Sequence, residues 1–126
     1  MAYLKQLLVQ YFRQGVPWKH IFLQLKEKYS THSIIVAKAQ LHTENPEIVL
    51  NWAKKVIQKY EPKCYKIVEN VDNYDKLVYL LHAKCGMSNR YISKLLGTWG
   101  VKYLRLKYKK TKTLLNSTSI EKEKSR

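Results

Sequence analysis

Glycine and proline are scarce in this chain of 126 residues, which contains four of the first and three of the second. Their scarcity disfavours a β-sandwich, in which turn residues recur at short intervals. No apolar run approaches the roughly 20 residues of a membrane span, so we expect no membrane partner. The first residues lack the basic leader, apolar core and cleavage site of a signal peptide, so we expect none.

Cysteine is scarce as well, with Cys64 and Cys85 as the two examples. Neither has a second cysteine or a histidine at zinc-ligand spacing, and we interpret both as reduced intracellular thiols. The basic parts of the chain contain no carboxylate pair, Ser/His arrangement or metal-ligand cluster. We therefore expect neither enzymatic activity, nor a metal, nor a cofactor.

Acidic residues are absent from one long stretch, because residues 76–112 hold ten Lys/Arg and no Asp or Glu. Residues 1–43 hold six bases and one acid, whereas residues 44–75 hold five bases and six acids. Two basic blocks thus flank a nearly neutral connector in a chain of net charge +15. A merely soluble surface mixes both signs along its length, so the separation indicates a polyanionic partner.

The chain does contain apolar periodicity typical of α-helices. In its first part, Gly15 can end one helix by adopting positive φ, and Pro17 suits the first turn of the next. Ser30 or Thr31 can cap a third helix. The pattern predicts helices over residues 3–14, 17–29 and 32–42.

A further helical pattern follows in the connector, where Asn45 and Pro46 can begin a helix and Pro62 can stop it. This helix is either a linker or a fourth helix that packs on the first part of the chain. Beyond it, Asp72 or Asn73, Gly86, Ser88 and Gly97 supply caps and breaks. These signals predict helices over residues 74–84, 89–96 and about 100–110.

The two basic blocks are similar to each other when Gly15 is aligned with Gly86, an offset of 71 residues. Ile21 then matches Ile92, and Leu25 matches Leu96. The identities are few, so the alignment indicates two copies of one local architecture more than a clear duplication. A single helical bundle with an accidental repeat is the alternative.

The stretch "LLHAKCGMSNRYISKLLGTWGVKYLRLKY" resembles the helix-turn-helix DNA-binding modules of transposases, resolvases and small regulators. The features in common are a leucine pair, a turn glycine, a small capping residue, an isoleucine, a leucine-glycine pair and a basic helix: Leu80, Leu81, Gly86, Ser88, Ile92, Leu96 and Gly97. The stretch "LLVQYFRQGVPWKHIFLQLKEKYSTHSIIVAKAQL" is similar, but Lys26 stands where a turn glycine is usual, and its turn is longer.

The resemblance implies an all-α fold with two small helix-turn-helix modules of three helices each. The first module covers residues 1–43 and the second covers residues 71–112. A connector helix over residues 44–70 joins them, and a basic, flexible tail covers residues 113–126.

In this family the third helix enters the major groove, and neighbouring helix ends contact phosphates. Arg105 is the best candidate for a bidentate contact with guanine. The DNA-binding residues implied in the second copy are Ser88, Asn89, Arg90, Lys94, Thr98, Lys102, Arg105, Lys107, Lys109, Lys110 and Lys112. Those implied in the first copy are Lys19, Thr31, His32, Ser33 and Lys38.

The function implied is sequence-specific binding of double-stranded DNA by a small, cytoplasmic, nucleoid-associated regulator of transcription. A homodimer is compatible with this role. An accessory protein of plasmid or viral partition, replication or recombination fits the same residues. RNA binding, and an adaptor that binds an acidic protein surface, are the alternatives from other classes.

Overall fold

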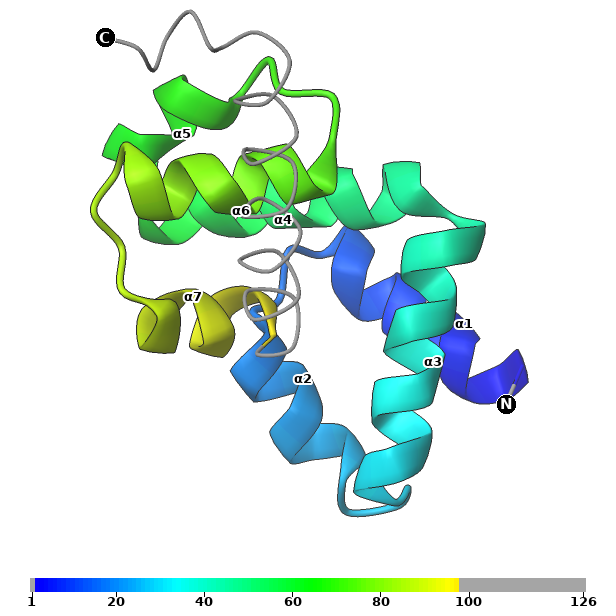
Figure 1. The fold of residues 1–126 in the computed structure, drawn as a ribbon. Coiled ribbons are helices and arrows are strands. Elements are labelled where there is room, and N and C mark those ends of the chain that lie inside the picture. The colour runs from blue at the N-terminus through cyan, green and yellow to red at the C-terminus, as the bar shows by residue number, and fades with distance from the viewer. Residues whose placement is uncertain (1, 98–126) are drawn as a thin grey trace, which may run out of the picture.

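The computed structural model describes residues 2–97, which form seven α-helices and contain no strand (Figure 1). The predicted all-α fold is therefore confirmed for this part of the chain. The predicted helix over residues 100–110 and the predicted tail lie outside the described residues. The helices are α1 (Ala2–Arg13), α2 (Trp18–Leu25), α3 (Thr31–Glu44), α4 (Pro46–Tyr60), α5 (Pro62–Val68), α6 (Tyr74–Ala83) and α7 (Asn89–Leu96).

Three of the helices begin at side-chain caps that the sequence predicts. Ser30 before α3, Asn73 before α6 and Ser88 before α7 each accept the backbone N–H of the residue three positions later. Each cap satisfies an N–H that has no partner within its helix, and contributes about 1 kcal/mol. Asn45 before α4 makes no such side-chain bond, and Pro46 occupies the first turn, where a missing N–H costs nothing.

The two turn glycines have the same conformation, since Gly15 and Gly86 both have φ of 70°. Helix α2 follows the first and α7 follows the second, and both helices span eight residues at an offset of 71. The predicted repeat of local architecture is therefore present in the turn glycine and in the one helix that follows it. Before the glycines the copies differ, because α1 buries Leu4 and Leu8 whereas α6 buries Leu77 and Leu81, an offset of 73.

The residue after each turn glycine has its carbonyl oxygen bound by a ring nitrogen. Trp52 Nε1 donates to the Val16 oxygen at 2.7 Å, and His82 Nδ1 donates to the Met87 oxygen at 3.0 Å. Two different side chains thus stabilise the same turn position in the two copies.

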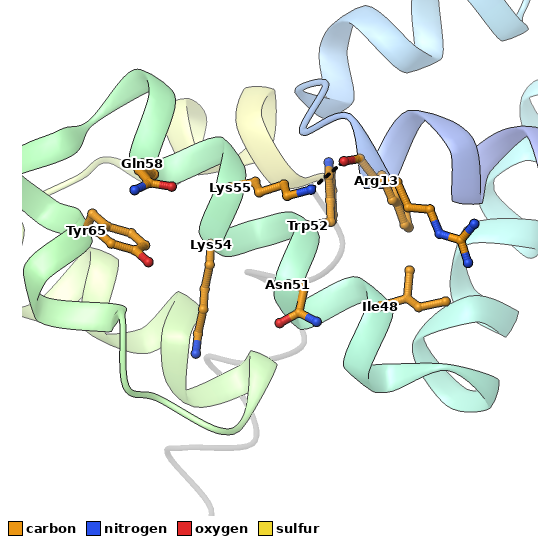
Figure 2. A pocket seen from close by; sticks show the side chains of 9 residues that line it. Arg13, Ile48, Asn51, Trp52, Lys54, Lys55, Gln58 and Tyr65 are labelled. Atoms are coloured by element: carbon orange, nitrogen blue, oxygen red, sulfur yellow. Dashed lines mark hydrogen bonds between the residues drawn. The ribbon is translucent and has the colours of Figure 1, made fainter.

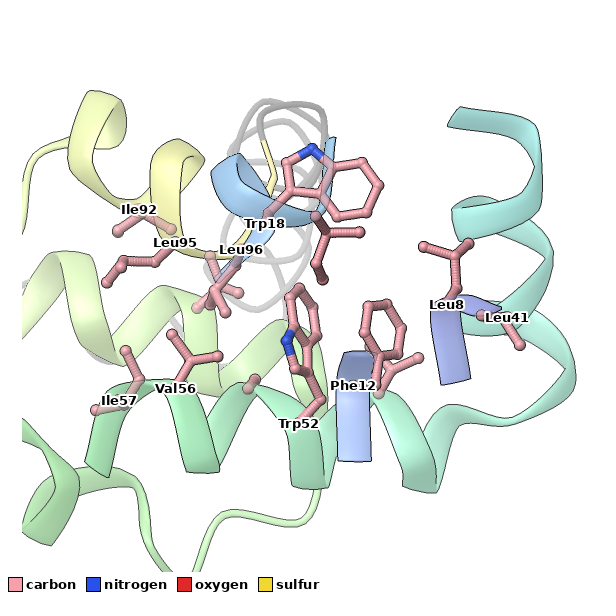
Figure 3. Close-up of a cluster of buried hydrophobic side chains, with 14 of the residues drawn as sticks. Leu8, Phe12, Trp18, Leu41, Trp52, Val56, Ile57, Ile92, Leu95 and Leu96 are labelled. Atoms are coloured by element: carbon pink, nitrogen blue, oxygen red, sulfur yellow. The ribbon is translucent and has the colours of Figure 1, made fainter. Parts of the chain in front are cut away.

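A single cluster of buried apolar side chains draws residues from all seven helices. Helix α2 packs on α7, and α4 packs on α1, α3, α5 and α6. In Figure 3, Leu95 and Leu96 of α7 point toward Val56 and Ile57 of α4. The predicted boundaries at residues 43/44 and 70/71 therefore do not separate two cores, and the tandem arrangement of modules is not confirmed.

The predicted connector helix over residues 44–70 is two helices, α4 and α5, because Pro62 interrupts it. Helix α4 lies at the centre of the fold instead of linking two units. The Trp52 ring stacks on Phe12 of α1, with centroids 4.1 Å apart and planes 15° from parallel. A broad apolar stripe on α4, made by Val49, Trp52, Ala53, Val56 and Ile57, gives it this central position.

Cys64 and Cys85 are distant in sequence but close in space, and both are free thiols. Burial, together with a hydrogen bond that the Cys85 S–H donates to Cys64, raises the pKa of the Cys85 thiol to about 12. Within residues 2–97 no group of three or more His, Cys, Asp or Glu is arranged to hold a metal ion. None of the described helices combines the length and the apolar character that crossing a membrane requires.

Candidate nucleic-acid interface

Helix α7 is strongly amphipathic and presents its cations outward. Ile92, Leu95 and Leu96 are buried, whereas Arg90 and Lys94 are exposed. Because these two bases are four residues apart, they lie on one face of the helix. No acidic residue belongs to α7, so this face offers two cations to an anionic partner.

The start of α7 holds the other predicted contacts of the second copy. Ser88 is exposed, but its hydroxyl oxygen is occupied by the N–H of Tyr91. Asn89 is half-buried, and its Oδ1 has no hydrogen-bond partner among the described residues. Both residues precede the exposed Arg90 at the N-terminus of α7. Free backbone N–H groups at a helix N-terminus favour a phosphate.

The first copy places its predicted residues on two different helices. Lys19 is exposed on α2, at the position equivalent to Arg90 on α7, and the two helices pack together. Thr31 and His32 are exposed at the start of α3, and Ser33 is half-buried beside the Ser30 cap. Helix α2 packs on α7, so Lys19 lies on a helix next to α7. Helix α3, which carries the other predicted residues of the first copy, packs on α1 and α4 instead.

The prediction that Lys38 contacts DNA is wrong, because its side chain is 1% exposed. Its Nζ lies 2.9 Å from His42 Nε2 and 5.1 Å and 5.7 Å from the ring centroids of Trp18 and Trp52. Lys38 shares its face of α3 with Ile34, and its aliphatic stem packs as an apolar side chain would. Burial lowers the pKa of Lys38 to about 7.

His42 is half-buried and lies next to Lys38. Its ring meets Tyr74 edge-on, with centroids 4.7 Å apart. Burial first, and the charge of Lys38 second, lower the pKa of His42 to about 3. The imidazole is therefore neutral at physiological pH, and its Nε2 can accept a hydrogen bond from the Lys38 amine.

Gly97 fixes the point at which the chain leaves α7. It is buried, with φ of 113°, and its N–H donates to the Ser93 oxygen. A Cβ at this position would lie 3.0 Å from both Cε and Nζ of Lys38 and 3.7 Å from Trp18. The positive φ favours glycine, and a side chain here would also displace the end of the Lys38 side chain.

Seven of the predicted contacts lie outside the described residues: Thr98, Lys102, Arg105, Lys107, Lys109, Lys110 and Lys112. Their roles stay predictions. The described part of the site consists of the amphipathic helix α7 and the buried Gly97, which comes directly before these residues in the sequence.

One basic feature was missed in the sequence analysis: a hollow of about 440 Å³ between α1, α4 and α5 (Figure 2). Arg13, Lys54 and Lys55 line it together with amide and aromatic side chains. The net charge of residues 44–75 is close to zero, which hid this local excess of cations. The signal that could have found it is the helical spacing of polar residues at 51, 54, 55 and 58, opposite the apolar stripe of α4.

The fold and the exposed cations define an all-helical protein with basic surfaces. Comparison of the chain with protein-family models, with curated proteins and with solved structures yields no match. The resemblance to helix-turn-helix modules therefore rests on the residues themselves.

Proposed function

We propose that the protein binds double-stranded DNA through α7 and the basic segment that follows it. The observation that carries the proposal is the continuity of positive charge from the outer face of α7 into residues 98–112. That segment holds six bases and no acid, directly after Arg90 and Lys94. The capped α7, entered through a glycine turn from α6, supports the assignment because helix-turn-helix proteins present DNA-binding residues in this order.

Reading of a specific sequence is assigned to Arg105, whose guanidinium can pair with both acceptors of guanine in the major groove. Phosphate contacts are assigned to Arg90, Lys94 and the lysines at 107–112. Regulation of transcription is the simplest role for such a protein. Accessory roles in partition, replication or recombination would use the same contacts.

The proposal is tested by binding of a labelled duplex over a series of salt concentrations, with structured RNA and an acidic protein as competitors. Duplex DNA should bind most tightly, and salt should weaken the complex steeply because bound phosphates release counterions. Tighter binding of RNA, or affinity that is insensitive to salt, would contradict the proposal.

The double variant Arg90→Gln/Lys94→Gln should reduce the magnitude of the negative slope of log K against log salt by about 2, since each phosphate contact contributes roughly 0.9. Both side chains are exposed, so the fold should be kept. The matched control is Lys63→Gln/Lys66→Gln, two exposed lysines of α5, a helix that packs on α4 and α6. Equal slopes for the two variants would exclude α7 from the interface.

A further inference from the structure

The hollow between α1, α4 and α5 presents cations and amides along one side of α4. Figure 2 shows Asn51, Lys54, Lys55 and Gln58 along this helix, with Arg13 of α1 at one end. Tyr65 of α5 lies at the other end and is half-buried. We call this surface the α4 groove.

The amines of the α4 groove are bound by carbonyl oxygens and not by carboxylates. Lys54 Nζ donates to the Glu69 oxygen at 2.9 Å, and Lys55 Nζ donates to the Arg13 oxygen at 2.6 Å. Each ammonium has three donors, so each keeps two for another acceptor.

Charge compensation is also missing from the α4 groove in the described part of the chain. The one ion pair among the described residues joins Lys5 to Glu44, outside the groove. The side-chain carboxylates of Glu47 and Glu69 both lie more than 4.0 Å from the groove cations. No acidic side chain lines the hollow. Three cations therefore surround an open space that a polyanion complements.

The α4 groove and the outer face of α7 point in opposite directions. On α4, the groove residues lie opposite Val56 and Ile57, which belong to the core. On α7, Arg90 and Lys94 lie opposite Leu95 and Leu96, which point toward α4. The core lies between the two basic surfaces, so one straight duplex cannot contact both.

We propose that the α4 groove binds the phosphate backbone of a second DNA duplex, so that one molecule bridges two duplexes. This inference rests on the proposed DNA binding through α7. Backbone binding uses lysine, arginine and amide side chains that need not distinguish bases.

The exposure of the groove residues favours a nucleic-acid backbone over a small phosphorylated ligand. Arg13, Asn51, Lys55 and Gln58 are all exposed. A small ligand is usually enclosed and oriented by a few buried polar groups. An open row of exposed donors instead fits a strand that passes across the surface.

The experiment measures bridging directly. One duplex is attached to beads, a second labelled duplex is added, and retention of the label is measured with a limiting amount of the full chain. Anisotropy with the labelled duplex alone reports binding to a single duplex. We expect the protein to retain the label on the beads.

The test variant is Arg13→Gln/Asn51→Glu, which lowers the net charge of the groove by two without removing a hydrogen bond of the fold. Its control, Lys28→Glu, makes the same change at an exposed loop position. The test variant should lose about tenfold in retention while its affinity for one duplex changes by less than about twofold. The control should bridge as the unmodified protein does.

The outcomes separate the two proposals. Binding of one duplex without any retention overturns the bridging and leaves the function through α7 in place. Retention that the groove variant keeps in full also overturns it, because a homodimer would then join the duplexes. Absence of binding to any duplex overturns both.

Discussion

Lys38 is predicted from its sequence context to be an exposed DNA contact, but it is a buried side chain of the core. A basic residue on a helix of a highly positive chain is usually solvated, and in a recognition helix it would meet a phosphate. Here Ile34 and Leu41 on the same face are buried, and the stem of Lys38 continues their stripe. The Lys38 amine contacts the rings of Trp18 and Trp52 and is hydrogen-bonded to His42, and these interactions offset part of the cost of removing the amine from water.

Stability should depend on pH through Lys38. Its pKa is about 7 in the folded chain and 10.5 without burial, so the unfolded chain binds more protons between these values. The free energy of unfolding therefore rises with pH across this window, by up to about 1.4 kcal/mol per pH unit. This contribution of Lys38 is lost as pH falls toward 7. Urea unfolding from about pH 7 to about pH 9 should give a smaller rise for Lys38→Met.

The control for this measurement is Lys28→Met, which makes the same substitution at an exposed lysine. Parallel slopes for the unmodified protein and Lys38→Met would show that the amine is not titrating in this range. His42 acts in the same direction at lower pH. Its pKa is about 3 in the folded chain and 6.5 without burial, so stability should fall further as pH falls through this interval.

At the scale of the helix and turn, local signals predicted much of what forms. Ser30, Asn73 and Ser88 cap helices as their side-chain chemistry predicts, and Gly15 and Gly86 take the positive φ that ends a helix. These features depend on a few neighbouring residues. The pairing of α2 with α7 depends on complementary surfaces 71 residues apart, and periodicity within each helix carries no information about its partner.

Gly97 and Gly86 provide a matched pair for testing the role of a turn glycine. Gly86→Ala places a methyl group where no atom lies within 4 Å, so the strain of φ at 70° is the main cost, about 1–2 kcal/mol. Gly97→Ala adds a contact at 3.0 Å with Lys38 to a backbone with φ of 113°. It should lose about 2–4 kcal/mol of the free energy of unfolding.

Chemical denaturation followed by circular dichroism measures both glycine variants. A smaller loss for Gly97→Ala than for Gly86→Ala would contradict the tight junction between α7 and Lys38. Combining Gly97→Ala with Lys38→Met should recover part of the loss, because the flexible thioether can move away from the new methyl group.

At the scale of the whole molecule, charge and core follow different divisions of the chain. The positive charge lies in two blocks separated by a neutral segment, which favours two modules. The core is not divided in this way. The neutral segment contains α4, and the apolar stripe of α4 packs on helices from both basic blocks. Sequence analysis could find the charge blocks by counting, but the shared core arises from contacts that form only after the chain folds.

A shared core predicts that damage in α7 is felt in the first half of the chain. Ile92 is fully buried, and Ile92→Ala should cost about 2–5 kcal/mol through lost contacts and a residual cavity. The measurement uses a Trp99→Phe background, in which tryptophan fluorescence comes from Trp18 and Trp52 alone. The fluorescence midpoint should shift to lower urea together with the circular dichroism midpoint, because all seven described helices share one core. Two independent modules would instead leave the tryptophan midpoint unchanged and split the circular dichroism transition.

Lys84→Ala, an exposed change just after α6, should move neither midpoint, so a shift specific to Ile92→Ala measures coupling through the core and not a general effect of substitution.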